Sequence, residues 1–334
     1  MAIAILTIVT STMSSLYNNR LNTYAILGTG ALGGYYGACL QRAGKEVHFL
    51  LHSDYDRVKE HGLIIESPGD DFTLPRVHAY NSAAKMPKCD VVVVALKTTQ
   101  NHLLPQLLPP VVKDDGVVLV LQNGLGIEEK VAQIVGNSRV MGGLCFLCSN
   151  KVGAGHIRHL DYKEIKLGEY NPNYQPGGVS ERMRLIGADF EKAGIPIKLR
   201  EDLLLARWQK LVWNIPYNGL SVILDATTNE LMADASNLEL VKELMYEVVA
   251  GAKKCDRIIP ESFIDEMLDH TAKMKPYRTS MKIDYDEKRV LEVEAIFGNP
   301  LKMVQRAGTQ LPRIATLYQQ LKFLDAKNRI KKDA

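Results

Sequence analysis

A glycine-rich turn is the feature that most constrains how this chain folds. Residues 28–34 read Gly-Thr-Gly-Ala-Leu-Gly-Gly and follow a short apolar run at residues 24–27. A helical pattern then ends at Gly44, where a helix C-terminal glycine belongs, and a second apolar run covers residues 47–51. Such a glycine motif is weak evidence alone, but between a strand and a helix it strongly indicates a dinucleotide-binding βαβ unit.

Each glycine has a distinct function in such a turn. The first makes the tight turn, the second lets the backbone approach a pyrophosphate, and the third lets the helix pack closely on the sheet. The helix N-terminus adds free N–H groups and a partial positive charge, both of which suit phosphates. The alternative interpretation is a glycine-rich turn that binds no ligand. The expected cofactor-binding residues of the turn are Gly28, Thr29, Gly30, Ala31, Leu32 and Gly33.

The end of the second strand indicates which dinucleotide is bound. NAD-preferring sites carry an acidic residue there, which holds the ribose 2′-hydroxyl. Here residues 49–54 read Phe-Leu-Leu-His-Ser-Asp, so no acid stands at the strand end and Asp54 lies beyond it. His52 and Ser53 can donate hydrogen bonds to a 2′-phosphate. We therefore expect NADP (NADPH) rather than NAD, although a neutral histidine is a weaker phosphate partner than arginine.

The rest of the sequence predicts two domains. Further apolar runs lie at residues 91–96, 117–121 and 140–147. The four valines 91–94 are typical of a strand buried on both faces of a parallel sheet. From about residue 201 long helical patterns replace the strands. We predict an α/β chain, with an N-terminal extension at residues 1–22, a Rossmann-type doubly wound parallel sheet over residues 23–200 and an all-helical C-terminal domain over residues 201–328.

Composition excludes several classes of function. Of 334 residues, 46% are hydrophobic and 24% charged, as in globular proteins and unlike disordered chains. The chain has 41 lysine and arginine residues and 38 acidic residues, which gives a net charge of +3. The basic residues do not cluster in a stripe, so we expect no nucleic-acid partner. The one basic cluster, residues 327–332, reads as a solvated tail. No apolar stretch reaches the roughly 18 residues of a membrane span, so we expect no membrane partner.

The five cysteines are too few and too scattered for a disulfide framework, which indicates a reducing compartment and a cytoplasmic protein. Cys145 and Cys148 have CxxC spacing, but they lie in an apolar run that reads as a strand. No second CxxC completes a zinc site. We interpret both as structural thiols and expect no metal.

Two polar residues follow the carboxyl ends of predicted central strands. Lys97 comes directly after the run at residues 91–96, and Asn123 comes just after the run at residues 117–121. Doubly wound folds bind their ligands in the crevice at these strand ends. We expect both residues to line the nicotinamide half of the cofactor site, with solvated loop residues as the alternative.

A polar stripe marks the first predicted helix of the second domain. Lys210, Asn214 and Asn218 recur every four residues and therefore share one face of that helix. Solvated faces are usually rich in Glu and Lys, whereas Asn is a poor helix former, and Pro216 interrupts the hydrogen-bond ladder at a cost of about 3 kcal/mol. The stripe is therefore better interpreted as a cradle for a carbonyl group and its neighbouring oxygens than as a wet helix face.

Six blocks in a fixed order make the chain resemble the ketopantoate reductase (2-dehydropantoate 2-reductase) family over residues 22–324. The blocks are residues 28–34, 95–100, 121–126, 208–219, 279–281 and 291–298. The resemblance implies NADPH-dependent reduction of the 2-oxoacid ketopantoate to pantoate, on the route to pantothenate and coenzyme A. It also implies a homodimer.

The resemblance implies a role for individual residues. Lys210 looks like the general acid that protonates the C2 oxygen, and Glu292 looks like the active-site glutamate near both cofactor and substrate. Such groups suit a reaction in which hydride attack builds charge on an oxygen. The implied substrate-binding residues are Asn123, Asn214, Asn218 and Ser280, and the implied cofactor-crevice residues are Lys97, Asn123 and Glu292.

Two positions depart from the family pattern. His52 stands where many relatives have Arg, and Phe297 replaces the usual Asn before Gly298, which predicts one polar contact fewer near the substrate mouth. These differences keep open a reductase of the same fold that acts on another small 2-oxoacid. An NADP-binding regulator without turnover is less favoured, because a pure binder has no use for Lys210 and Glu292.

Overall fold

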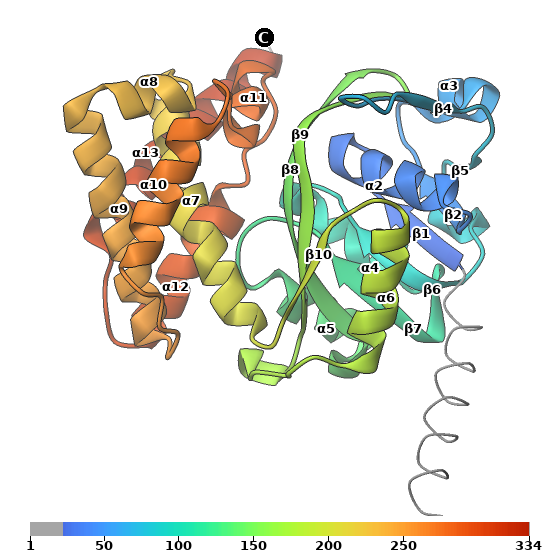
Figure 1. The fold of residues 1–334 in the computed structure, drawn as a ribbon, viewed down its shortest axis with the longest axis horizontal. Coiled ribbons are helices and arrows are strands. Elements are labelled where there is room, and N and C mark those ends of the chain that lie inside the picture. The colour runs from blue at the N-terminus through green and yellow to red at the C-terminus, as the bar shows by residue number, and fades with distance from the viewer. Residues whose placement is uncertain (1–22, 334) are drawn as a thin grey trace, which may run out of the picture. The chain divides into compact units, whose positions relative to one another are not determined.

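The computed structural model describes residues 23–333, and the predicted extension at residues 1–22 lies outside them. The described chain divides into two compact units (Figure 1). The first comprises the residues up to Gln122 together with Glu128–Leu203, and the second comprises Asn123–Ile127 together with the residues from Leu204 onward. The sequence gives no indication that Asn123–Ile127 joins the helical unit.

The first unit is an α/β domain built on a sheet of ten strands. The strands are β1 (Thr23–Leu27), β2 (Glu46–Leu50), β3 (Leu63–Glu66), β4 (Phe72–Leu74), β5 (His78–Tyr80), β6 (Cys89–Val94), β7 (Val112–Val120), β8 (Val140–Gly153), β9 (His156–Glu169) and β10 (Ile197–Arg200). The helices are α2 (Ala31–Arg42), α3 (Tyr55–His61), α4 (Leu104–Leu107), α5 (Ile127–Val135) and α6 (Glu181–Lys192). Short 3₁₀ turns lie at η1 (Ala83–Lys85), η2 (Thr98–Leu103), η3 (Asn137–Arg139) and η4 (Pro172–Tyr174).

The central strands have the order of a dinucleotide-binding sheet. The series β5-β2-β1-β6-β7-β8 is parallel throughout, which is the 3-2-1-4-5-6 order of the Rossmann fold. Val91–Val94 are fully buried at its centre, which confirms the predicted strand with two covered faces. Leu27 pairs with Val94, so β1 and β6 end level with each other. The glycine turn and the loop with Lys97 therefore leave the sheet at the same edge.

The predicted Rossmann-type parallel sheet is confirmed at the centre, and antiparallel strand pairs extend it. Strands β8 and β9 form a long antiparallel hairpin, and β3 pairs with β4 in the same manner. Strand β9 reads HIRHLDYKEIKLGE, and these many polar residues leave no apolar run to reveal it. Cys145 and Cys148 lie on β8 as buried thiols, on either side of a shift in register.

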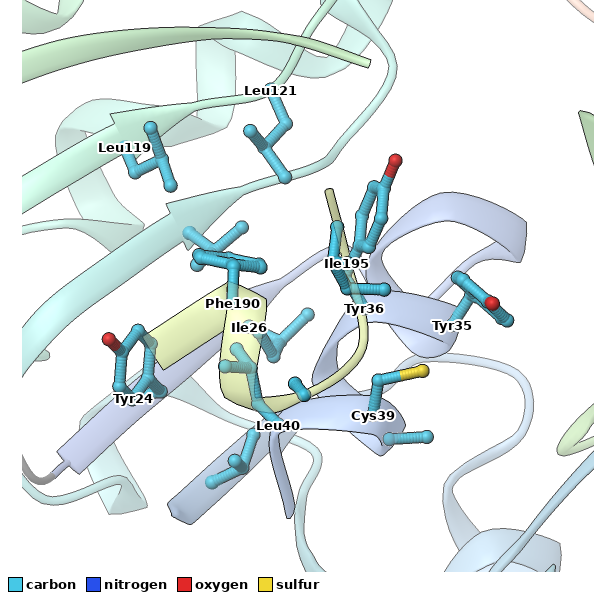
Figure 2. Packing of buried hydrophobic residues seen from close by; sticks show 14 of the residues in the cluster. Tyr24, Ile26, Tyr35, Tyr36, Cys39, Leu40, Leu119, Leu121, Phe190 and Ile195 are labelled. Atoms are coloured by element: carbon cyan, nitrogen blue, oxygen red, sulfur yellow. The ribbon is translucent and has the colours of Figure 1, made fainter. Parts of the chain in front are cut away.

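Aromatic side chains from β1, α2 and α6 pack together on one face of the sheet (Figure 2). Tyr24 and Tyr36 each meet Phe190 edge to face, with ring centroids 6.4 and 6.2 Å apart. The Tyr24 hydroxyl donates to Asp189 (2.7 Å), which also pairs with Lys45 (2.6 Å), so the polar groups of this core are satisfied. Burial raises the pKa of Tyr24 well above its usual value. This core fixes α2 and with it the glycine turn at the start of that helix.

The second unit contains only helices among its described residues, as predicted. They are α7 (Leu203–Ile223), α8 (Thr228–Ala233), α9 (Ala235–Lys254), α10 (Ser262–Lys273), α11 (Ser280–Asp286), the π-helical turn η5 (Glu294–Gly298), α12 (Asn299–Arg306) and α13 (Pro312–Asp333). Residues 327–332 lie in α13, where Lys327 and Arg329 are exposed, as a solvated basic cluster predicts. Asn328 is buried there and its Nδ2 donates to the Tyr285 carbonyl (3.0 Å). No helix between residues 23 and 333 is long and apolar enough to cross a membrane.

Candidate active site

Two positions of the glycine turn have no room for a side chain. Gly28 has φ +101°, and a Cβ there would lie 2.5 Å from the Leu96 nitrogen. A Cβ on Gly33 would lie 2.3 Å from the Gly28 carbonyl oxygen and 2.8 Å from the Ala95 Cβ. The first glycine is therefore needed for the turn and the third for the close packing of α2 on the sheet.

Gly30 differs from both, because a Cβ there would meet no atom within 4 Å. It is the N-cap of α2, where no side chain caps the helix and the first turn contains no acidic residue. Thr29 Oγ1 donates to the Leu50 carbonyl (2.9 Å) and holds the turn against β2. Space therefore lies beside the start of α2, whose first residues are Ala31 and Leu32. An uncapped helix N-terminus behind a glycine turn fits a dinucleotide pyrophosphate.

The loop after β2 holds the residues expected at the adenosine ribose. His52 is exposed, whereas Asp54 is buried and accepts hydrogen bonds from Lys151 Nζ (2.7 Å) and the Gly155 N–H (3.0 Å). Burial acts to raise the pKa of Asp54, but these hydrogen bonds outweigh it and lower that pKa. The Ser53 hydroxyl also donates to Asp54 (3.0 Å). The first carboxylate after β2 is therefore ionised and tied to the β8–β9 hairpin, which leaves His52 as the exposed candidate for a 2′-phosphate.

Lys97 is exposed in the loop directly after β6. Gln122, buried just after β7, donates from Nε2 to the Leu96 carbonyl (2.7 Å) and to Asn101 Oδ1 (2.6 Å). Gln122 therefore ties the ends of β6 and β7 together and positions the backbone next to Lys97. In the sequence Gln122 stands out only by its place after an apolar run and within the block 121–126.

Lys210, Asn214 and Asn218 lie on one face of α7, as their spacing predicts. Asn214 is 6% exposed and Asn218 is 2% exposed, and Lys210 is partly buried. The two amides are therefore not on a solvated helix face. Buried amides are hydrogen-bonded in folded proteins, so a stripe of buried amides on one helix face is typical of a site for polar groups. Helix α7 continues past Pro216 to Ile223.

Two contacts attach the start of α11 to this face of α7. The Met281 N–H donates to Asn218 Oδ1 (3.3 Å), and the hydroxyls of Ser221 and Thr279 lie 2.8 Å apart. Thr279 is also the N-cap of α11, where its Oγ1 accepts from the Lys282 N–H (3.2 Å). Ser280 lies between the two attached residues, so the structure brings Ser280 and Asn218 together. Ser221 and Thr279 do not stand out in the sequence as positioning residues.

Glu292 is 3% exposed and lies just before η5. The preceding Leu291 is fixed by its N–H, which donates to Asp325 Oδ1 of α13 (2.9 Å). Phe297, the departure from the family pattern, is fully buried within η5. It is a core residue, so its replacement of Asn changes packing rather than a solvent-lined mouth.

Asn123 opens a short segment that the second unit holds. The Leu125 N–H donates to the Ala295 carbonyl (2.9 Å), and Asn299 Nδ2 donates to the Leu125 carbonyl (2.7 Å). Gly124, with φ +97°, approaches η5 so closely that a Cβ would lie 2.3 Å from the Ala295 oxygen. The segment with Asn123 is therefore attached to the same turn that follows Glu292.

The candidate residues thus form two groups, one in each unit. The first unit presents an open glycine turn, His52 and Lys97, which suit a phosphorylated dinucleotide. The second unit presents Lys210, the buried amides and a buried carboxylate, which suit proton transfer to an oxygen and stabilisation of its charge. Within residues 23–333, no three His, Cys, Asp or Glu side chains gather as a metal site would require.

Comparisons with known proteins match both units. The family "Ketopantoate reductase PanE/ApbA" matches residues 24–172, and "Ketopantoate reductase PanE/ApbA C terminal" matches residues 202–325. A 2-dehydropantoate 2-reductase of Nostoc sp. is 69% identical over 306 residues, which cover 92% of this chain and 96% of that protein. Among solved structures, a 2-dehydropantoate 2-reductase from Geobacter metallireducens is 41% identical with a TM-score of 0.86, covering 90% of this chain and 99% of its own. The enzyme of that name from Methylococcus capsulatus is 33% identical with a TM-score of 0.83, covering 92% and 97%.

Proposed function

The chain belongs to the ketopantoate reductase family, and from this membership we propose that it is a 2-dehydropantoate 2-reductase, which reduces ketopantoate to pantoate with NADPH. The product serves the synthesis of pantothenate and coenzyme A. The observation that carries the proposal is the face of α7, where Lys210 shares one side with two buried amides. A 2-oxoacid offers a ketone oxygen and a carboxylate, and an ammonium and amide N–H groups are donors to both.

NADPH fits the residues proposed to bind it. The space at Gly30 and the uncapped start of α2 accommodate the pyrophosphate. His52 holds the 2′-phosphate. An available carboxylate at this place would favour NAD by binding the 2′-hydroxyl, but Asp54 is paired with Lys151 instead. Lys97 and Asn123 hold the nicotinamide half.

When bound, NADPH supplies the hydride that reduces C2 of ketopantoate. Lys210 gives a proton from its ammonium group to the C2 oxygen as that oxygen becomes negative, so the ketone becomes a secondary alcohol. Asn214, Asn218 and Ser280 donate hydrogen bonds to the oxygens of the substrate, which orients it and stabilises the developing charge. Because Asn218 Oδ1 accepts from the Met281 N–H, its Nδ2 remains to donate to the substrate.

Glu292 supports the proton donor. We assign Glu292, a buried carboxylate, to the support of the Lys210 ammonium group, because an opposite charge stabilises a nearby cation. Glu292 lies two residues before η5, the turn that holds the segment with Asn123. This place in the chain supports the proposal that Glu292 serves both the cofactor and the substrate.

The test of the substrate follows nicotinamide absorbance while the protein oxidises NADPH in the presence of ketopantoate, with NADH and a panel of other 2-oxoacids run in parallel. We expect turnover with ketopantoate and a preference for NADPH. Turnover with a different 2-oxoacid but not with ketopantoate would refute the substrate and retain the mechanism. No turnover with any of them, with NADPH still bound, would favour a regulator.

The test of the proton donor is Lys210→Ala. We expect turnover to fall by a factor of about 10² to 10⁴, because general acid catalysis contributes that much, while NADPH binding by the first unit is retained. Lys253→Ala is the matched control, since Lys253 is exposed on α9. Near-normal turnover of Lys210→Ala, or loss of its NADPH binding, would show that Lys210 is not the acid.

The proposal also includes a cellular location and an oligomeric state. Five cysteines this scattered in the sequence are typical of a reducing compartment, so we propose a cytoplasmic location. We expect a homodimer, and light scattering of the purified protein measures the mass directly.

A further inference from the structure

The segment Asn123–Ile127 is held to the helical unit through the backbone of Leu125. Its N–H donates to the Ala295 carbonyl (2.9 Å), and its carbonyl accepts from Asn299 Nδ2 (2.7 Å). Both polar groups of one residue are thus fixed by η5 and the first residue of α12. Gly124 and Gly126 flank it with φ +97° and +74°, conformations that let the chain pass close to the helix.

The sequence explains why η5 can offer this contact. In an α-helix the Asn299 N–H would donate to the Ala295 carbonyl, but in this π-turn it donates to Glu294 instead. The next residue, Pro300, has no N–H to replace it. The Ala295 carbonyl is therefore available to Leu125, and the Asn299 side chain adds the second hydrogen bond. A π-turn followed by Asn-Pro makes a two-point clamp for one peptide backbone.

We propose that Asn299 is a positioning residue that sets Asn123 for the nicotinamide half of NADPH through the Leu125 backbone. The inference rests on the role proposed above for Asn123. Asn299 does not touch the cofactor itself. Its amide fixes Leu125, and Gly124 is confined against Ala295, so little freedom remains for Asn123. Loss of the clamp releases Asn123 while the glycine turn and His52 stay as they are.

The test compares Asn299→Asp with Gln305→Glu. The first change replaces the donor by an oxygen that repels the Leu125 carbonyl, and the second makes the same amide-to-acid change at an exposed position of α12. Calorimetry measures the binding of NADPH and of 2′-phospho-ADP-ribose, which lacks the nicotinamide. We expect Asn299→Asp to weaken NADPH binding about tenfold, as loss of one well-placed hydrogen bond does, and to leave the fragment unaffected. Gln305→Glu should bind both ligands as the unaltered protein does.

A double-mutant cycle with Asn123→Ala separates positioning from a general structural role. If Asn299 acts through Asn123, Asn299→Asp causes no further loss of NADPH affinity once Asn123 is Ala. Three results would overturn the proposal: additive losses of NADPH affinity in the double variant, equally weakened binding of 2′-phospho-ADP-ribose in Asn299→Asp, or unchanged NADPH affinity in Asn299→Asp. Should Asn299→Asp fail to fold, Asn299→Ala removes the donor without adding a charge, and the same outcomes decide.

The binding measurements distinguish failure of this inference from failure of the proposed function. If Asn123→Ala itself binds NADPH normally, then Asn123 has no cofactor role and Asn299 cannot act through it. If Asn123→Ala weakens binding but Asn299→Asp does not, only the positioning role of Asn299 is refuted. A lack of turnover with ketopantoate would change neither result, because both rest on binding.

Discussion

Gly30→Ala separates the binding function of the glycine turn from its folding function. A Cβ at Gly30 meets no atom within 4 Å, and the residue has φ −90° and ψ −158°, which alanine adopts without strain. Reduced entropy of the unfolded chain stabilises the variant by about 0.4–1 kcal/mol. Alanine is a poorer N-cap than glycine, which opposes this by up to about 1 kcal/mol. The free energy of unfolding should therefore stay within about 1 kcal/mol of the original value.

The same methyl group should weaken NADPH binding strongly. It occupies the space in front of the first turn of α2, where the pyrophosphate must approach the backbone. Loss of one hydrogen bond to a charged group costs about 1.5–3 kcal/mol, which corresponds to roughly a 10- to 100-fold weaker affinity. Urea unfolding without ligand and calorimetric titration with NADPH measure the two effects separately.

Gly33→Ala is the contrasting variant. Its Cβ would lie 2.3 Å from the Gly28 carbonyl oxygen, so the helix must shift away from the sheet. We expect a loss of about 1–3 kcal/mol of stability or more from this overpacking. If Gly30→Ala binds NADPH as tightly as the original protein, the cofactor does not approach this turn and the assignment of the site is refuted.

Two further variants test the electrostatics and the thiols. Asp54→Asn should lower the free energy of unfolding at neutral pH by about 1–2 kcal/mol, because the hydrogen bonds from Lys151 and Gly155 lose their charged acceptor. The folded state lowers the pKa of Asp54, so its contribution is present above the unfolded pKa of about 4 and disappears as the pH falls through the lower, folded value. Urea unfolding of both proteins should therefore show a gap that closes below about pH 4, and a gap that persists there would contradict this reasoning. Cys255 is the one partly exposed cysteine of the five, so a thiol reagent should modify it first in the native protein, and Cys255→Ser should abolish this fast phase. An unchanged fast phase would place the reactive thiol elsewhere.

The features that can be predicted from the sequence are those that depend on residues close together in the chain. The glycine turn, the valine strand and the stripe on α7 each depend on residues within about one helix or strand, where periodicity and turn chemistry decide the structure. Burial of Asn214 and Asn218 agrees with the interpretation of the stripe as a polar site. The hairpin of β8 and β9 escapes such patterns, since a strand rich in charged residues gains its stability from pairing across the sheet.

The features that the sequence does not predict depend on contacts between residues far apart in the chain. The segment Asn123–Ile127 follows a strand of the first unit, yet its backbone is bonded to residues about 170 positions later. The residues around Leu125 do not indicate that its carbonyl accepts a hydrogen bond from Asn299. Helix α13 is similar, because Asn328 lies in a basic stretch and yet is buried, with its Nδ2 donating to the Tyr285 carbonyl. Such placements follow from which elements meet in the fold, and a single sequence does not encode that in any short window.

Asn218 shows how one side chain satisfies the fold and the chemistry together. The Met281 N–H lies in the first turn of α11, where it has no partner within its own helix. Asn218 Oδ1 accepts that hydrogen bond at a position only 2% exposed, where an unsatisfied group would be costly. Aspartate at this position could accept equally well, but its carboxylate would repel an anionic 2-oxoacid and could not donate to it. The fold therefore requires an acceptor, the proposed substrate requires a donor, and a short amide provides both.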